Sequence, residues 1–172
     1  GNKRLNKKTL FYLLVSLLVI WMIVIFCFSA QPATKSANLS EGVGRRVASI
    51  LVPNFQNWDD TKQNQYVESI DFFVRKTAHF TEYMILGGLW LLCIYNRPDE
   101  SSSFGKKIGI SVCASAIYAI SDVFHQLFVE GRAGRWMDVG IDTMGAIAGI
   151  GLVTIGIKLF ILIRVHMEKM SK

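Results

Sequence analysis

Ionisable side chains occur near one end of three of the four long apolar segments of this chain. Charged groups are energetically unfavourable in hydrocarbon, so in such segments they usually pair, line a cavity or mark a functional site. We predict that the three polar ends lie on the same side of a membrane and form one pocket. The residues are Arg75, Lys76, His79, Glu82, Asp122, His125, Gln126, Arg132, Arg135, Asp138 and Asp142.

Two pairs of these residues have a spacing that suits a metal ion. His79-x-x-Glu82 and Asp122-x-x-His125 each place an imidazole and a carboxylate at positions i and i+3. This pattern is similar to the Glu-x-x-His arrangement of metal sites in helix bundles, and two histidines with carboxylates suit zinc. A divalent metal ion is therefore one candidate cofactor. With an open coordination position it would hydrolyse a lipid-borne substrate.

A metal-free site is the second hypothesis. Basic side chains at the mouth of the pocket would bind a phosphate or carboxylate group, while His79 or Asp122 serves as acid or base. The basic residues are Arg75, Lys76, Arg132 and Arg135.

A purely structural role is the third hypothesis, with salt bridges between helices such as Arg132 or Arg135 with Asp138. Polar interactions between membrane helices are worth only about 0.6–2 kcal/mol each. That gain is small for the burial of so many ionisable groups. We therefore favour a functional role for the histidines and carboxylates of the cluster.

Length and hydropathy predict an all-α integral membrane protein. The chain has 172 residues, of which 51% are hydrophobic, and a mean hydropathy of +0.34. About 20 helical residues cross a hydrocarbon core of roughly 30 Å. Four segments reach this length, at about residues 9–30, 70–95, 107–129 and 137–163, and we assign residues 1–172 to a single domain.

The segment 36–68 is predicted to hold one or two helices in the membrane interface, which either clamp the bundle or cover the polar cluster as a lid. Ser36 and Ser40 are predicted helix caps, Pro53 ends the first helix, and Asp59 or Asp60 caps a second helix leading into the second span. Apolar residues recur at helical spacing, which is typical of an amphipathic interfacial helix. They are Leu39, Val43, Val47, Ile50 and Leu51.

Basic residues beside the spans predict the orientation. The positive-inside rule places both termini in the cytoplasm, so the polar ends lie on the outer side of the plasma membrane. The net charge of +6 thus indicates topology and no nucleic-acid binding. The basic residues predicted to be cytoplasmic are Lys3, Arg4, Lys7, Lys8, Arg97, Lys106, Lys107, Arg164, Lys169 and Lys172.

The last span contains a G-x-x-x-G pattern at Gly145 and Gly149. Small residues at this spacing allow two membrane helices to approach closely. The polar cluster is therefore expected to lie beside a tightly packed seam.

Four stretches of the sequence resemble the VanZ-like family of small bacterial membrane proteins. They are FSAQP (28–32), RKTAHFTEY (75–83), SDVFHQLF (121–128) and GRAGRWMDVGIDTMG (131–145). The family is associated with resistance to teicoplanin, a glycopeptide that carries a fatty acyl tail. The resemblance therefore implies a role in the antibiotic response of the Gram-positive cell envelope.

These observations lead to one main hypothesis and one alternative. The protein is expected to bind a membrane lipid or lipoglycopeptide in an outer-leaflet polar pocket and so to lower sensitivity to teicoplanin. The alternative is a membrane-embedded, metal-dependent or metal-free enzyme that modifies the head group of a lipid or cell-envelope precursor. The sequence indicates no oligomeric state.

Overall fold

Five α-helices make up most of the part of the chain that the structure describes. The computed structural model describes residues 2–98 and 101–170, with side chains from Lys7 onward. Within these ranges there is no β-strand, and a short 3₁₀-helix, η1 (Phe55–Asn57), lies between the second and third α-helices. The α-helices are α1 (Asn2–Ser29), α2 (Ala33–Leu51), α3 (Asp60–Asn96), α4 (Phe104–Gln126) and α5 (Trp136–Met170).

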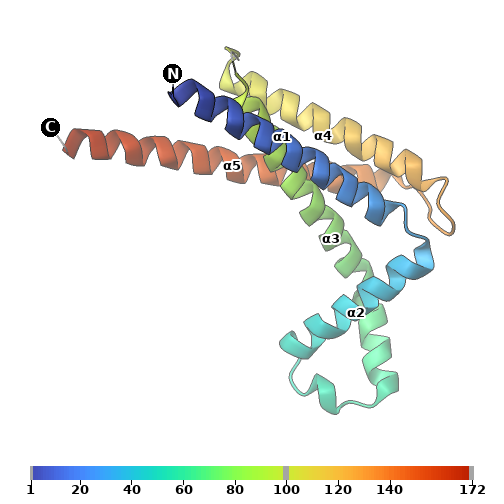
Figure 1. Cartoon of the computed structure of the whole chain (residues 1–172). Helices are drawn as coiled ribbons and strands as arrows, with labels where there is room; N and C mark the ends of the chain where they lie inside the picture. The colour runs from blue at the N-terminus through green and yellow to red at the C-terminus, as the bar shows by residue number, and fades with distance from the viewer. Residues whose placement is uncertain (1, 99–100, 171–172) are drawn as a thin grey trace.

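Four of these helices, α1, α3, α4 and α5, are long and apolar enough to cross a membrane. The predicted all-α membrane fold with four spans is therefore confirmed. At 1.5 Å per residue the 37-residue α3 is about 55 Å long, well beyond the roughly 30 Å of a hydrocarbon core. Its first part and α2 form an arm, residues 33–73, that projects from the bundle (Figure 1).

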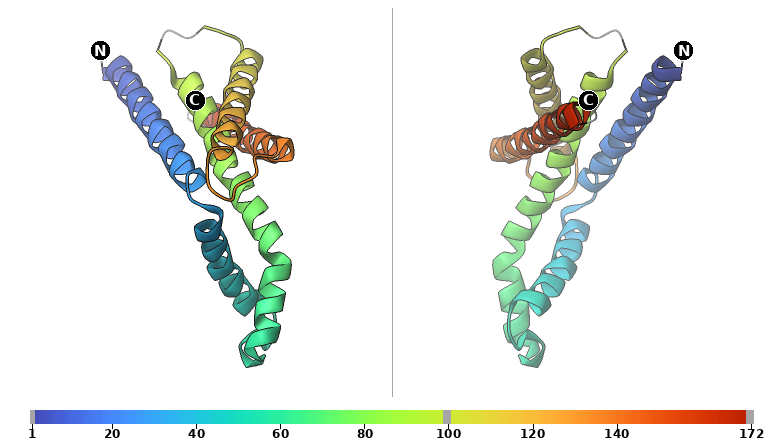
Figure 2. Two further views of the ribbon diagram at one scale, coloured as in Figure 1. Left: turned by 90° about the vertical axis from the view of Figure 1, so that its right-hand side faces the viewer. Right: turned by 90° about the vertical axis from the view of Figure 1, so that its left-hand side faces the viewer.

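Both termini and the connection between α3 and α4 lie at one end of the bundle (Figure 2). The opposite end, formed by the last residues of α1 and α4 and the turn 127–135, is called the polar end below. Which end faces the cytoplasm remains a prediction. Lys3, Arg4 and Lys172, which contribute to it, lie outside the described side chains.

Helix α2 begins earlier than predicted. Its N-cap is Pro32, with φ −53°, and a proline at a helix start loses no internal hydrogen bond. The prediction that Ser36 and Ser40 cap this helix is therefore wrong. Ser40 is buried against α3, where its hydroxyl donates hydrogen bonds to the Ala37 carbonyl (2.9 Å) and to the Asp71 carboxylate.

Helix α3 begins where predicted but is not divided. The Asp59 carboxylate accepts a hydrogen bond of 3.0 Å from the backbone N–H of Lys62, which confirms this residue as the N-cap. No separate second interfacial helix forms, because the helix runs without interruption from Asp60 to Asn96. The arm is thus a rigid extension of a membrane span.

The arm has its own small core. Ala48 of α2, Phe55 of η1 and Val67 of α3 are buried together. The Gln63 side-chain amide donates to the carbonyls of Phe55 (3.1 Å) and Trp58 (3.0 Å), which holds the α2–α3 connection against α3. The arm therefore does not depend on membrane contact alone for its shape.

Helices α3 and α5 form the most extensive helix pair of the bundle. A Cβ atom added to Gly145 would lie 2.3 Å from the carbonyl oxygen of Phe80, and one added to Gly149 would lie 1.8 Å from that of Met84. Any side chain at either position would displace the backbone of α3. The predicted close approach along the G-x-x-x-G pattern is confirmed, and it fixes the register of α5 on α3.

We expect Gly149→Ala to lower the thermal unfolding midpoint of the detergent-solubilised protein by several degrees, because overpacking a tight contact costs about 1–3 kcal/mol. Gly151→Ala is the matched control, since a Cβ there has nothing within 4 Å. Differential scanning fluorimetry measures both midpoints. Equal midpoints in the two variants would contradict the proposed seam.

Candidate functional site

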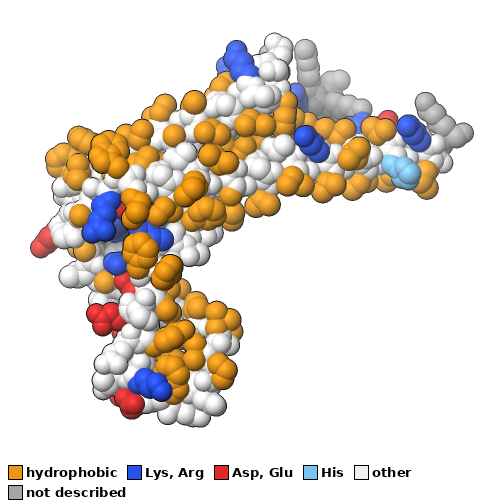
Figure 3. Space-filling model, turned by 180° about the vertical axis from the view of Figure 1, so that it is seen from behind, with side chains coloured by type: hydrophobic (Ala, Val, Ile, Leu, Met, Phe, Trp, Pro, Cys, Tyr) orange, Lys and Arg blue, Asp and Glu red, His pale blue; other side chains and the backbone are white. Residues whose placement is uncertain are grey.

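A basic pocket of about 230 Å³ opens at the polar end, between α3, the start of α2, the turn 127–135 and the first residues of α5. Lys and Arg side chains gather where the arm meets the bundle (Figure 3). Seven of the predicted site residues line this cavity. They are Arg75, Lys76, His79, Gln126, Arg132, Arg135 and Asp138.

A larger apolar groove of about 790 Å³ adjoins the basic pocket. Leu39, Val43 and Val47 of α2 form one wall, and Ile70 and Phe73 of α3 form another. The arm is therefore neither a plain clamp nor a closed lid, because its inner face bounds an open groove. The two cavities adjoin, since four residues line both of them: Ser36, Arg75, His79 and Arg132.

Two ion pairs fix the basic residues of α3. The Lys76 ammonium pairs with the Asp138 carboxylate of α5, and both side chains are about four-fifths buried. Arg75 pairs with Asp71 at 2.8 Å within α3. The same Asp71 carboxylate accepts the Ser40 hydroxyl, so it links Arg75 to the arm.

Arg132 does not form the predicted structural salt bridge. Its guanidinium donates to two carbonyls at the end of α1, Gln31 (2.9 Å) and Phe28 (3.1 Å). The predicted partner, Asp138, forms its ion pair with Lys76 instead. Arg132 therefore ties the turn 127–135 to α1 and keeps its positive charge. Partial burial lowers its pKa from the ordinary value, and the Asp122 carboxylate opposes this shift.

His79 lies between two carboxyl groups. Its Nδ1 atom is 3.8 Å from Glu82 Oε2 and 4.0 Å from Asp142 Oδ1. Glu82 also lines the apolar groove. Asp142 is only 1% exposed, and neither of its oxygens accepts a hydrogen bond from a described residue. The structure thus brings together an imidazole and two carboxyl groups beside the basic pocket.

The residues predicted on α4 separate into two groups. Asp122 and Gln126 are buried, and the Gln126 amide donates to Asp122 (3.2 Å) and to Ser29 at the end of α1 (2.8 Å). His125 instead stacks on Phe26 of α1, with ring centroids 4.4 Å apart. It lines neither cavity described above.

The metal hypothesis lacks the geometry that it needs. A metal ion at this site would need both His79 and His125 as ligands, but the His125 ring instead stacks on Phe26 of α1. Among the described side chains, no three His, Cys, Asp or Glu groups are arranged to hold a metal ion. The residues present therefore do not fit the predicted His₂–carboxylate centre.

Sequence reasoning missed three residues that shape the site. Ser29 contacts Gln126, while Ser40 and Asp71 connect the arm to Arg75. Ser29 belongs to the FSAQP stretch, so the family resemblance could have identified it as a site residue. The residues Ser40, Gly44 and Ala48 form a buried face of small side chains on α2. A search for large apolar residues at helical spacing does not detect this face.

The fold and site define a multi-pass helical membrane protein with a charged pocket at one end of its bundle. The VanZ/LLP1 family model matches residues 14–160, so the chain belongs to that family. The expected resemblance is confirmed. No curated protein and no solved structure matches the chain.

We expect the Lys76–Asp138 pair to contribute measurably to stability, because its partners are largely removed from water. A double-mutant cycle with Lys76→Met and Asp138→Asn should give a coupling energy of about 1–3 kcal/mol. Unfolding in a detergent–denaturant titration provides the free energies. The exposed Arg164–Glu168 pair, with 65% of each side chain accessible, should couple by less than about 0.5 kcal/mol, and a similar value for both pairs would contradict this expectation.

Proposed function

We propose that this protein binds an anionic amphiphile, with the head group in the basic pocket and an acyl chain in the apolar groove. The adjacency of the two cavities carries this proposal, because a charged site beside an apolar groove matches a molecule with a charged head group and an apolar tail. Ligand pockets commonly combine apolar walls with a few placed polar groups.

The available positive charge supports an anionic head group. The Arg132 guanidinium donates to two backbone carbonyls and forms no ion pair within 4.0 Å among the described residues. Arg135 is exposed at the rim of the pocket, and its guanidinium has no ion pair with a described residue. Guanidinium groups bind phosphate and carboxylate through paired, charge-assisted hydrogen bonds.

Family membership extends the proposal to the cell envelope. The VanZ-like resemblance is associated with teicoplanin, whose acyl tail is the kind of group that the groove would accept. We infer that binding of a lipid, or of the lipoglycopeptide itself, lowers sensitivity to this antibiotic in a Gram-positive cell.

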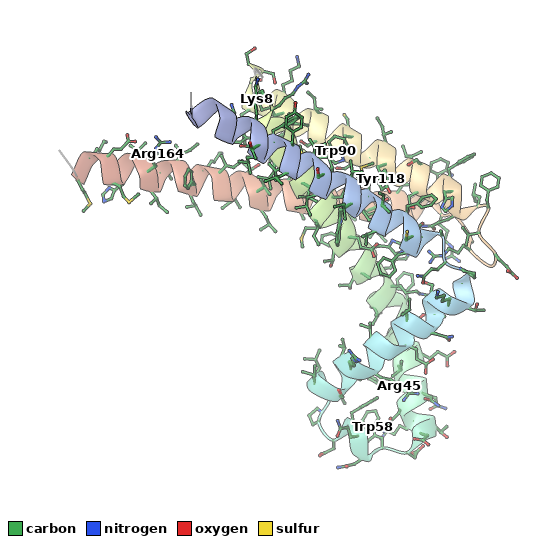
Figure 4. The ribbon with its side chains drawn as sticks, viewed as in Figure 1. Lys8, Arg45, Trp58, Trp90, Tyr118 and Arg164 are labelled. Atoms are coloured by element: carbon green, nitrogen blue, oxygen red, sulfur yellow. The ribbon has the colours of Figure 1, made fainter. Side chains whose placement is uncertain are left out.

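The proposed orientation places the polar end outside the plasma membrane. Lys8 and Arg164 lie toward the end of the bundle away from the arm (Figure 4), and Lys106 and Lys107 begin α4 at that same end. The positive-inside rule assigns this end to the cytoplasm. The basic pocket would then face the leaflet that lipoglycopeptides reach.

Cysteine labelling tests the orientation. In a variant without the native cysteines, we expect Glu130→Cys to react with a membrane-impermeable maleimide in intact cells, because residue 130 lies in the turn of the polar end. Ser101→Cys, between α3 and α4, should react only after the cells are lysed. The reverse pattern would show that the pocket faces the cytoplasm.

Binding is best tested with Arg135→Gln, because this side chain forms no ion pair or side-chain hydrogen bond with a described residue. We expect its affinity for fluorescent phosphatidylglycerol to fall about tenfold, since a charge-assisted hydrogen bond contributes about 1.5–3 kcal/mol. Fluorescence anisotropy of the detergent-solubilised protein measures the affinity, and teicoplanin susceptibility is compared in cells that express each variant. Arg164→Gln, at the opposite end, is the matched control.

A groove variant tests the acyl-chain part separately. Val43→Asp places a charge on the groove wall, whereas Ile50→Asp lies on α2 outside the groove and is 80% exposed. Binding should weaken for Val43→Asp alone. Unchanged affinity in both Arg135→Gln and Val43→Asp would overturn the proposal.

A further inference from the structure

Asp142 is a buried carboxylate that nothing in the binding proposal uses. Its side chain is 1% exposed, and neither oxygen accepts a hydrogen bond within the described residues. An unpaired buried carboxyl group is strongly unfavourable unless a partner or a function compensates for it. Its nearest basic group is the His79 imidazole, with Nδ1 at 4.0 Å from Oδ1.

The α3–α5 seam positions this pair. Gly145 lies one helical turn after Asp142, and its Cα packs on the carbonyl of Phe80, the residue that follows His79. Because this contact is between the two backbones, the separation of α3 and α5 at His79 and Asp142 does not depend on flexible side chains. The two functional groups are thus held at a distance that a small ring movement closes to a hydrogen bond, as often occurs when substrate binds.

The second nitrogen of His79 is directed elsewhere. Nδ1 faces Glu82 and Asp142, and the two nitrogens of an imidazole point in divergent directions. His79 lines both the basic pocket and the apolar groove. Nε2 therefore points away from the two carboxyl groups, and His79 lies where the head group and the acyl chain of the proposed ligand would join.

We propose that the site also hydrolyses phosphate monoesters of membrane lipids, with His79 as the nucleophile and Asp142 as its positioning residue. This inference rests on the proposed function, because the same pocket must first bind the phosphate. An aspartate that holds a histidine in the correct tautomer is a recurring device for activating the other ring nitrogen.

The first step forms a bond from Nε2 to phosphorus and breaks the bond from phosphorus to the lipid oxygen. The departing oxygen takes the proton carried by the monoprotonated phosphate group of the lipid, because Glu82 lies on the Nδ1 side of the His79 ring. Asp142 stabilises the positive imidazolium of the phosphorylated histidine. Arg132 and Arg135, which line the same pocket without an ion pair among the described residues, supply positive charge to the transferring phosphoryl group, the main contribution of protein to such reactions.

The second step uses water. The water attacks phosphorus, the bond from phosphorus to Nε2 breaks, and a proton of the water passes to a phosphoryl oxygen. Phosphate leaves, and His79 returns to its starting state. The net change converts a lipid phosphate and water into the lipid alcohol and inorganic phosphate.

The test uses the purified full chain in detergent with dioleoyl phosphatidic acid as the lipid and p-nitrophenyl phosphate as a soluble ester. We expect phosphate release from the lipid at a rate at least tenfold above that from the soluble ester, because only the lipid fills the groove. His79→Gln should abolish release while lipid affinity stays within threefold, and His166→Gln, on the exposed last turns of α5, should match the parent protein.

Asp142→Asn tests the positioning role. It should lower kcat about 10²-fold, the scale expected for a misplaced catalytic group, and leave KM within threefold. Asp60→Asn, an exposed aspartate in the first turn of α3, is its control. Mass spectrometry of peptides kept at neutral pH should detect phosphohistidine at position 79 in the parent protein, and less of it in Asp142→Asn.

The outcomes separate the two proposals. Lipid binding without phosphate release by the parent protein, or release that persists in His79→Gln, overturns the hydrolase and leaves the binding function standing. A change in KM alone for Asp142→Asn overturns its positioning role. Absence of lipid binding by the parent protein overturns the binding function itself.

Discussion

The backbone contact between α3 and α5 is the constraint on which the rest of this structure depends. Without side chains at Gly145 and Gly149, α5 lies directly on the carbonyl groups of α3. Apolar side chains alone do not specify how membrane helices pair, because lipid tails solvate them equally well. Close backbone packing does, and here it sets which residues of the two helices face each other at the polar end.

The charges of the polar end fall into two groups. Lys76 and Arg75 are neutralised by Asp138 and Asp71, and these pairs connect helix to helix and helix to arm. Among the described residues, Arg132 and Arg135 form no ion pair, and the Asp142 carboxylate accepts no hydrogen bond. The protein thus neutralises the charges that position its helices and leaves others for a ligand, so its basic mouth and acidic interior lie side by side around His79.

The arm gives the pocket its apolar extension. Because α3 continues beyond the thickness of a membrane, α2 can pack on it through a small core and turn a row of aliphatic side chains toward the bundle. Asp71 joins this unit to the pocket through Ser40 and Arg75. A shift of the arm would therefore move a residue of the head-group site together with the groove.

The sequence by itself determined the four spans, the amphipathic α2, a helix cap at Asp59 or Asp60 and the glycine seam, because hydropathy, period and residue size act locally. It also identified most residues of the basic pocket. Only the tertiary structure decided their partners. His125 and Asp122 lie three residues apart on α4, yet His125 stacks on Phe26 and Asp122 accepts a hydrogen bond from Gln126. The spacing within one helix determines which residues share a face. The neighbouring helices determine which residues that face contacts. The two histidines of the predicted metal site, His79 and His125, therefore have different surroundings, and His79 lies beside Asp142.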